Sequence, residues 1–210
     1  MSGIVGSGHN IRGSGVIAKL GTDGQVFTSA GAGVSATFED AAGGGFTQTS
    51  AIATTSGTNH TFTSIPSGTN IIYLLLNDVS INNNDDDFLI TIGDSGGLET
   101  SGYNEFNGRI NAGGLNTWTK QTAAWHISVK AIAYGVSGFC QIVRGDANGL
   151  IWHFSAMSTI NLTGAGEDGS CAFSSFSTGV KTLSAELDRV DIKGDAGSTF
   201  DRGSMTLLYI

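Results

Sequence analysis

The sequence predicts an all-β protein: an antiparallel jelly-roll-like β-sandwich of about eight to ten strands, preceded by an extended glycine-rich N-terminal arm. Short runs in which apolar and polar residues alternate indicate strands that are buried on one face. Clusters of Gly, Asn, Asp and Ser between these runs indicate turns. No alternation of strand and helix patterns is visible, which argues against a parallel sheet.

The arm is predicted over residues 1–45, where Gly, Ser and Ala dominate. A segment with so few apolar residues cannot bury a core of its own, so we expect it to become ordered on a partner. Residues 41–45, Ala-Ala-Gly-Gly-Gly, are interpreted as a hinge. The chain then divides into an attachment arm, residues 1–45, and a β-sandwich domain, residues 46–210. The residues expected to make the attachment are Ile4, Val5, Ile11, Val16, Ile17 and Leu20.

The strands of the domain follow from a period of two. Residues 71–76 are apolar at every position, so we expect a central strand covered on both faces. Residues 121–135 are the one segment that competes as a helix, but their β-branched residues and missing capping box favour a strand. Clear alternation places these residues on one face of their strands: Phe88, Ile90, Ile92, Trp125, Ile127, Val129, Trp152, Phe154, Ala156, Val190, Ile192, Met205, Leu207 and Tyr209.

Charge excludes two classes of partner. The net charge is −8, and the 10 Lys and Arg residues are scattered singly along the 210 residues. Nucleic acid binding needs a basic face that displaces counterions from phosphates, and binding to an anionic membrane surface also needs a basic face.

The apolar run at 71–76 is too short to span a bilayer, and the first residues lack the pattern of a signal peptide. We therefore expect a chain that is synthesised and folds in a cytoplasm.

The two cysteines do not indicate a metal site. Cys140 and Cys171 each lie in an apolar stretch, there is no C-x-x-C, and no His pair has metal-ligand spacing. We expect two buried free thiols, with a disulfide as the alternative. A domain of this size does not need a covalent link to be stable.

Residues 93–97, Gly-Asp-Ser-Gly-Gly, match the sequence around a serine nucleophile. A nucleophilic serine needs a histidine base and an orienting carboxylate, and none of the 4 histidines has the expected context. We interpret the stretch as a turn in which Asp94 and Ser95 cap backbone amides. Residues 13–18 fit G-x-G-x-x-A but lack the strand and helix of a dinucleotide site. No catalytic residue and no cofactor are predicted.

Two binding candidates remain. Residues 82–87, Asn-Asn-Asn-Asp-Asp-Asp, hold a dense set of oxygens in which Asp85, Asp86 and Asp87 are a candidate calcium site. They lack EF-hand spacing, so a solvated hairpin loop is the alternative. Trp118, in a polar stretch, and Tyr103 are candidates for contact with a glycan. Trp125 and Trp152 are assigned to the core because each lies on the apolar face of its strand.

Three stretches of the sequence are distinctive when they are taken together. They are residues 20–33 with Phe38 and Glu39, residues 62–68 with 92–103, and residues 187–190 with 199–205. The first resembles a recurrent N-terminal segment of bacteriophage tail-fibre and virion-surface proteins. The second and third resemble the beginning and the closing strands of a domain common in that family, which usually has Ala where Arg202 stands. Residues 105–180 resemble the family only loosely.

The resemblance implies a virion component that is commonly oligomeric and has no catalytic residues. It also implies that residues 93–97 form a family turn. Our first hypothesis is a tail fibre or spike whose sandwich contacts the host surface. The alternative is a capsid decoration protein or head fibre clamped to the shell by the arm. A glycan-active enzyme, the third hypothesis, would need a carboxylate pair that the sequence does not nominate. The expected partners are other phage virion proteins, two further copies in a homotrimer, and a host-surface glycan.

Overall fold

The chain forms two units that are described separately here. Contacts between Cα atoms divide it into residues 1–45 and 46–210. In the first unit, β1 (Gln25–Thr28) and β2 (Thr37–Asp40) form an antiparallel pair. The expected attachment residues Ile4, Val5, Ile11, Val16, Ile17 and Leu20 lie outside the described residues. The computed structural model describes residues 25–28, 37–40, 45–83, 86–111, 114–119, 122–129, 134–162 and 171–210.

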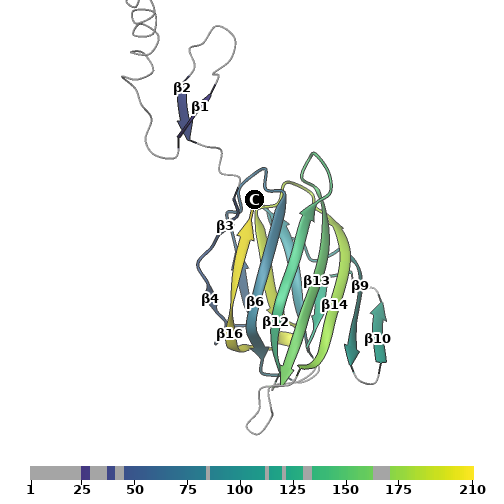
Figure 1. The fold of residues 1–210 in the computed structure, drawn as a ribbon. Helices are drawn as coiled ribbons and strands as arrows, with labels where there is room; N and C mark the ends of the chain where they lie inside the picture. Colours follow the sequence, from purple (N-terminus) through teal and green to yellow (C-terminus); the bar gives the residue numbers. More distant parts are fainter. Residues whose placement is uncertain are drawn as a thin grey trace, which may run out of the picture. The chain divides into compact units, whose positions relative to one another are not determined.

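The second unit is an all-β sandwich of two antiparallel sheets, as predicted (Figure 1). The large sheet has nine strands in the order β10-β9-β14-β13-β12-β6-β16-β3, with β4 also paired to β16. Its strands are β3 (Thr47–Gln48), β4 (Ile52–Ala53), β6 (Ile71–Ile81), β9 (Asn104–Asn111), β10 (Gly114–Thr119), β12 (Tyr134–Arg144), β13 (Ile151–Leu162), β14 (Cys171–Thr182) and β16 (Phe200–Tyr209).

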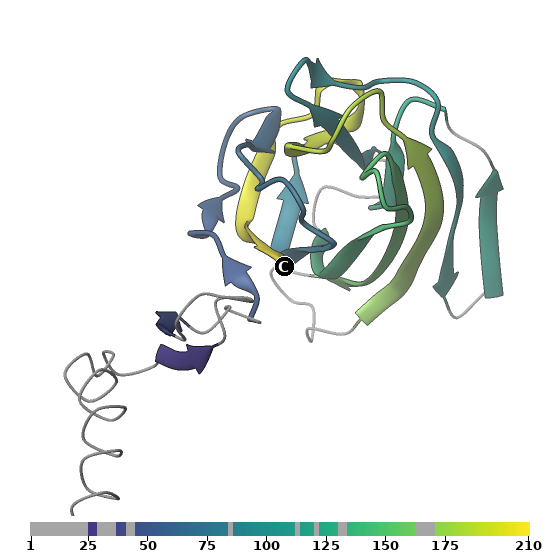
Figure 2. The same ribbon diagram turned by 90° about the horizontal axis from the view of Figure 1, so that it is seen from above.

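The small sheet has five strands in the order β11-β7-β15-β5, with β8 also paired to β7. Its strands are β5 (Asn59–Phe62), β7 (Asp87–Asp94), β8 (Gly97–Leu98), β11 (Trp125–Ser128) and β15 (Arg189–Gly194). A single 3₁₀ turn, η1 (Asp195–Gly197), is the one helical element of the described residues. The described part of the chain contains no helix that is long and apolar enough to cross a membrane. The large sheet curls, so that β9 and β14 approach β11 (Figure 2).

The two sheets hold more strands than the eight to ten predicted. β3, β4 and β8 have two residues each, too short for any alternation to be recognised. β9 and β10 come from a polar stretch without a clear apolar face. The segment 121–135 contributes to strands, as predicted, but to two of them: β11 in the small sheet and the beginning of β12 in the large one.

The core lies between the sheets and contains both tryptophans assigned to it. Trp125 on β11 stacks on Phe154 of β13, with ring centroids 4.6 Å apart and planes 8° from parallel. The indole of Trp152 is 1% exposed and donates a hydrogen bond to the carbonyl of Gly149 at 2.9 Å. Along β13, buried and exposed residues alternate from 152 to 160, so the period of two is confirmed.

The expectation that residues 71–76 are covered on both faces is wrong. Ile72, Leu74 and Leu76 are buried, whereas Tyr73 is half-buried and Leu75 is exposed. β6 lies within the large sheet, with β12 and β16 as its neighbours, and only its inner face packs against the small sheet. The outer side chains of β6 are apolar because they belong to a surface that the large sheet presents.

Candidate functional site

The outer face of the large sheet carries a row of apolar side chains in register. Leu75 on β6 is paired with Phe139 on β12, and Phe139 with Met157 on β13. Met157 is paired with Phe176 on β14, and Phe176 with Gly108 on β9. Figure 1 shows β6, β12, β13 and β14 side by side. Neighbouring strands lie about 4.8 Å apart, so directly paired side chains contact one another.

Aromatic contacts extend this row in both directions. The ring of Phe139 lies 6.2 Å from that of Tyr73, which in turn lies 5.5 Å from the ring of Phe46. On the other side, Phe176 lies 6.2 Å from Phe106 on β9. Apolar contacts thus run across the sheet from the segment before β3 to β9.

No Asp, Glu, Lys or Arg occupies an outward position in the middle of these five strands, although the chain has 28 charged residues in the ratio of 10 basic to 18 acidic. We call this surface the uncharged face. It consists of Ile71, Tyr73, Leu75, Asn104, Phe106, Gly108, Ile110, Ser137, Phe139, Gln141, Val143, His153, Ser155, Met157, Thr159, Ser174, Phe176, Thr178 and Val180.

A shallow hollow of about 340 Å³ lies at one end of the uncharged face. Its exposed lining residues offer an aromatic ring from Phe106, an amide from Asn104, an imidazole from His153 and a hydroxyl from Thr178. Beneath it, Gly179 allows β14 to approach the core, because a Cβ there would meet the indole nitrogen of Trp125 at 2.6 Å. An aromatic surface beside a few polar groups is the usual composition of a small-molecule site.

Residues 93–97 form a tight hairpin between β7 and β8 and not a strand–turn–helix elbow. Gly93 pairs with Leu98, and a Cβ on Gly93 would lie 2.1 Å from the carbonyl oxygen of Gly97. Asp94 accepts hydrogen bonds from the Ser184 hydroxyl at 2.8 Å and the Gly96 amide at 2.7 Å. These two bonds, that from Ser184 foremost, lower the pKa of Asp94. The predicted turn and its cap by Asp94 are confirmed, whereas the cap by Ser95 stays a prediction.

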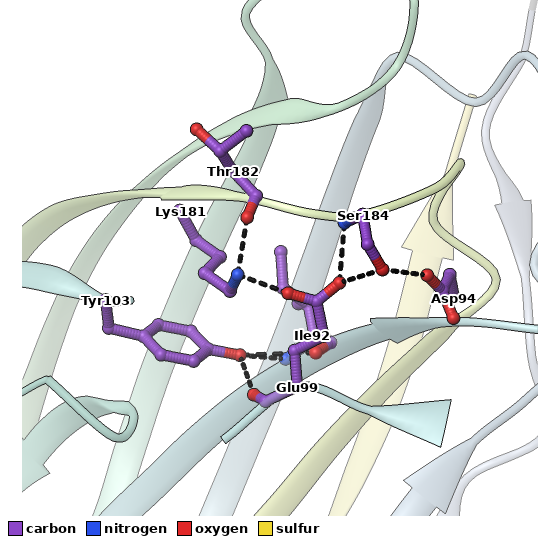
Figure 3. A network of polar contacts seen from close by, with 7 residues as sticks. All are labelled: Ile92, Asp94, Glu99, Tyr103, Lys181, Thr182 and Ser184. Carbon is purple, nitrogen blue, oxygen red and sulfur yellow. Dashed lines mark hydrogen bonds and ion pairs between the residues drawn. The ribbon is translucent and has the colours of Figure 1, made fainter. Parts of the chain in front are cut away.

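Figure 3 shows that Glu99 joins this hairpin to the end of β14. Its carboxylate pairs with the ammonium of Lys181, which is 4% exposed. It also accepts a hydrogen bond from the Ser184 amide at 2.6 Å, and its oxygen lies 2.8 Å from the Ser184 hydroxyl, whose single proton it shares with Asp94. Burial acts to raise the pKa of Glu99, but the bonds from Lys181 and Ser184 together outweigh it and lower the pKa. The network engages both carboxylate oxygens of Glu99 and ties the chain after β8 to the chain after β14.

Tyr103 cannot contact a glycan, contrary to the prediction, because it is 2% exposed. Its hydroxyl accepts a hydrogen bond from the Ile92 amide at 2.8 Å and is placed to donate to the carbonyl of Glu99 at 2.9 Å or of Ile92 at 3.2 Å (Figure 3). Burial raises the pKa of this phenol. The ring of Tyr103 instead packs edge-on against that of Trp125 in the core, with centroids 5.1 Å apart.

The other predicted aromatic, Trp118, lies on β10 opposite Asn107, and its side chain is outside the described residues. Cys140 is a buried free thiol, as expected, and burial raises its pKa. The side chain of Cys171 is outside the described residues. The alternative of a disulfide at Cys140 is therefore wrong.

The calcium candidate is only partly within the described residues, because Asp85 lies outside them. Asp86 accepts hydrogen bonds from Asn83 at 2.8 Å and from the Ser198 hydroxyl. Asp87 accepts one from the Val129 amide at 3.2 Å, and burial raises its pKa. Among the described residues no group of three His, Cys, Asp or Glu is placed to hold a metal ion.

A buried polar cluster between β9, β11 and β14 was missed by the sequence analysis. Glu105 accepts hydrogen bonds from the Ser177 hydroxyl at 2.7 Å and the His126 amide at 2.5 Å, and its second oxygen lies 2.7 Å from His126 Nδ1. Ser177 bonds to the carboxylate and not to the imidazole, so the three do not form a nucleophile–base–acid relay. The cluster joins the two sheets.

No family model, curated protein or solved structure matches this chain. The uncharged face and its hollow are therefore the features from which a function has to be argued.

Proposed function

We propose that this chain is a non-enzymatic bacteriophage virion protein, a tail-fibre or spike component whose β-sandwich binds a host-surface glycan. The hollow between Asn104, Phe106 and His153 is the observation that carries the proposal. A neutral sugar presents C–H faces and hydroxyls. An aromatic ring can stack on the former, while the amide, imidazole and hydroxyl groups of the hollow can exchange hydrogen bonds with the latter.

Glu105 is the one charged residue in the lining of the hollow and it is buried, which favours a neutral ligand. An Asp or Lys in this surface would have to give up water to a partner that offers it no opposite charge, at a cost of several kcal/mol if the charge is fully buried. The serine and threonine hydroxyls of the uncharged face lose less on contact with a sugar. On β13, Ser155 and Thr159 are exposed and carry such hydroxyls.

The roles of the carboxylates nearest the hollow support a binding role over a catalytic one. Glycoside cleavage needs two carboxylates that face one cleft. Glu105 lies behind the hollow with both oxygens engaged by His126 and Ser177. Glu99 and Asp94 are engaged by Lys181 and Ser184.

We further propose that the arm attaches the chain to other virion proteins and that three copies associate as a homotrimer.

Binding of the full-length protein to host cells, and to surface polysaccharide purified from them, tests the proposal. Phe106→Ala and His153→Ala should each weaken binding at least about tenfold, since a stacked ring or a hydrogen-bonding group is worth about 1–3 kcal/mol. Thr159→Ala, on the same strand as His153 but away from the hollow, is the control and should bind normally. Equal binding by all three variants contradicts the assignment.

Immunogold labelling of virions with an antibody against the protein tests its location. Label on the tail is expected. Label on the capsid alone, together with no binding to host cells, would instead identify a decoration protein or head fibre.

A further inference from the structure

We infer that the middle of the uncharged face is the surface through which copies of this chain pack on one another. The contact consists of an apolar band formed by Leu75, Phe139, Met157, Phe176, Ile110 and Leu115. The first four are cross-strand neighbours, and Ile110 and Leu115 are paired with each other at the β9–β10 end of the sheet.

The side chains of the band leave a large apolar area exposed. Met157 is 64% exposed, Leu115 61%, Ile110 53%, Phe139 41% and Leu75 36%. Together these five side chains expose about 500 Å², if a fully exposed large side chain presents ~200 Å². On a monomer, an apolar patch of this size often marks an interaction site.

This area matches what association of identical subunits requires. A standard interface buries ~800 Å² on each partner, and in homodimers ~65% of it is apolar, which amounts to about 500 Å². Ser137, Thr159 and Ser174 line one side of the band and supply hydroxyls for a polar rim. Two such faces can pack as sheets do in a sandwich, about 10 Å apart and with aligned strands.

Charge favours a second copy as the occupant. Two copies that each carry −8 repel one another, and the repulsion is weakest where neither presents a charged group. A basic partner would instead be drawn to the acidic parts of the surface, where it gains opposite charge. An uncharged band on an acidic chain is therefore complementary to itself, which suits a two-fold contact between copies, whereas a homotrimer would set the band against a second, different surface of the neighbouring copy.

The inference does not depend on glycan binding. The hollow residues Asn104, His153 and Val180 lie four residues along the strands from the row of Met157, whereas Phe106, which also lines the hollow, lies next to Phe176 of the band. A protein that associates but binds no glycan, or binds glycan as a monomer, is distinguishable in solution.

Light scattering coupled to size exclusion, on the full-length protein up to about 100 μM, tests the inference. The expected mass is a multiple of 21.6 kDa, and a single-chain mass throughout this range overturns it. Met157→Glu should weaken association at least about 100-fold, because each copy then brings a charge into an apolar contact. Met157 is so exposed that the substitution should leave folding intact, which circular dichroism checks.

Two further variants separate the band from a general effect of charge. Met157→Ser removes apolar area without adding charge and should weaken association about tenfold. Thr55→Glu adds the same charge at an exposed position outside the uncharged face and should leave the mass unchanged. Association that survives Met157→Glu, or that Thr55→Glu disrupts equally, overturns the inference.

Discussion

The hydroxyl of Tyr103 accepts a hydrogen bond at 2.8 Å from the backbone amide of Ile92, at the point on β7 where pairing with β11 has ended. β11 pairs with β7 only as far as Ile90. The Ile92 amide, two residues further along β7, therefore has no residue of β11 as its partner. The side chain from the loop after β8 supplies the missing partner. The Tyr103 hydroxyl thereby takes the place of a backbone carbonyl as the hydrogen-bond acceptor of the Ile92 amide.

Tyr103→Phe should therefore destabilise the protein by about 1–3 kcal/mol, because the buried Ile92 amide loses its acceptor. Tyr73→Phe is the matched control, since that hydroxyl accepts a hydrogen bond from Gln141 at 2.8 Å on the half-buried outer face. It should change stability by less than about 0.5 kcal/mol. Urea unfolding measures both, and equal losses would refute the role given to Tyr103.

Glu105→Ala should cost about 3 kcal/mol or more, because the His126 amide and the Ser177 hydroxyl both lose a buried acceptor. Asn104→Ala, the neighbouring residue that points outward, should lie within about 0.5 kcal/mol of the parent protein. The same unfolding experiment compares them. If the Glu105 variant were as stable as the Asn104 variant, the cluster would not hold the sheets together.

Stability should fall as the solution is acidified below about pH 4, the ordinary range of carboxyl groups. The pKa of Asp94 is lowered by Ser184 and Gly96, and that of Glu99 is lowered because the bonds from Lys181 and Ser184 outweigh burial. A carboxyl group whose folded pKa is depressed stabilises the protein above its unfolded pKa, and this contribution is lost on protonation. Melting temperatures of the protein and of Glu99→Gln between pH 7 and pH 3 should converge toward low pH.

Asp87 should behave in the opposite way, because burial raises its pKa. A carboxyl group with a raised pKa costs stability as the pH rises from its unfolded to its folded pKa, and the full cost is present above the folded value. Asp87→Asn keeps an oxygen for the Val129 amide and should raise the melting temperature at pH 7. The gain should shrink in acid. A loss of stability at pH 7 would mean that the charge itself is needed.

The hairpin at residues 93–97 permits a test of its structural role. Gly93→Ala should destabilise the protein by more than about 2 kcal/mol, since the new Cβ would meet backbone atoms of Gly97 and Leu98 within 3 Å. Ser95→Ala should change stability by less than about 0.5 kcal/mol, because Ser95 is exposed. A large loss from the serine substitution would contradict the assignment of this sequence as a turn.

The sequence predicted those parts of the fold in which apolar residues alternate and face the core. On β13, Trp152, Phe154 and Ala156 are buried as expected. β9 was not predictable, because it inverts the rule: Glu105 points into the interior and Phe106 lies 42% exposed at the surface. The partners that make a buried glutamate acceptable, His126 and Ser177, are distant in sequence, and only the folded sheets bring them together.

The uncharged face was missed for a related reason. Leu75, Phe139, Met157 and Phe176 come from four separate strands, and no single strand shows by itself that these residues form one row. Their alignment depends on register, which a local pattern does not contain. The sequence does contain one indication of this face, the excess of apolar residues within β6. That excess was interpreted as a strand covered on both faces.

The outer side of β16 is paired in two short pieces, by β3 at Leu208 and Tyr209 and by β4 at Ser204 and Met205. Strands of two residues expose very few backbone groups to which another chain could add. This margin of the large sheet is therefore a poor template for extending the sheet into a neighbouring molecule. Contacts across the face can produce a closed assembly of fixed size, whereas an open margin here would invite ribbon growth and precipitation.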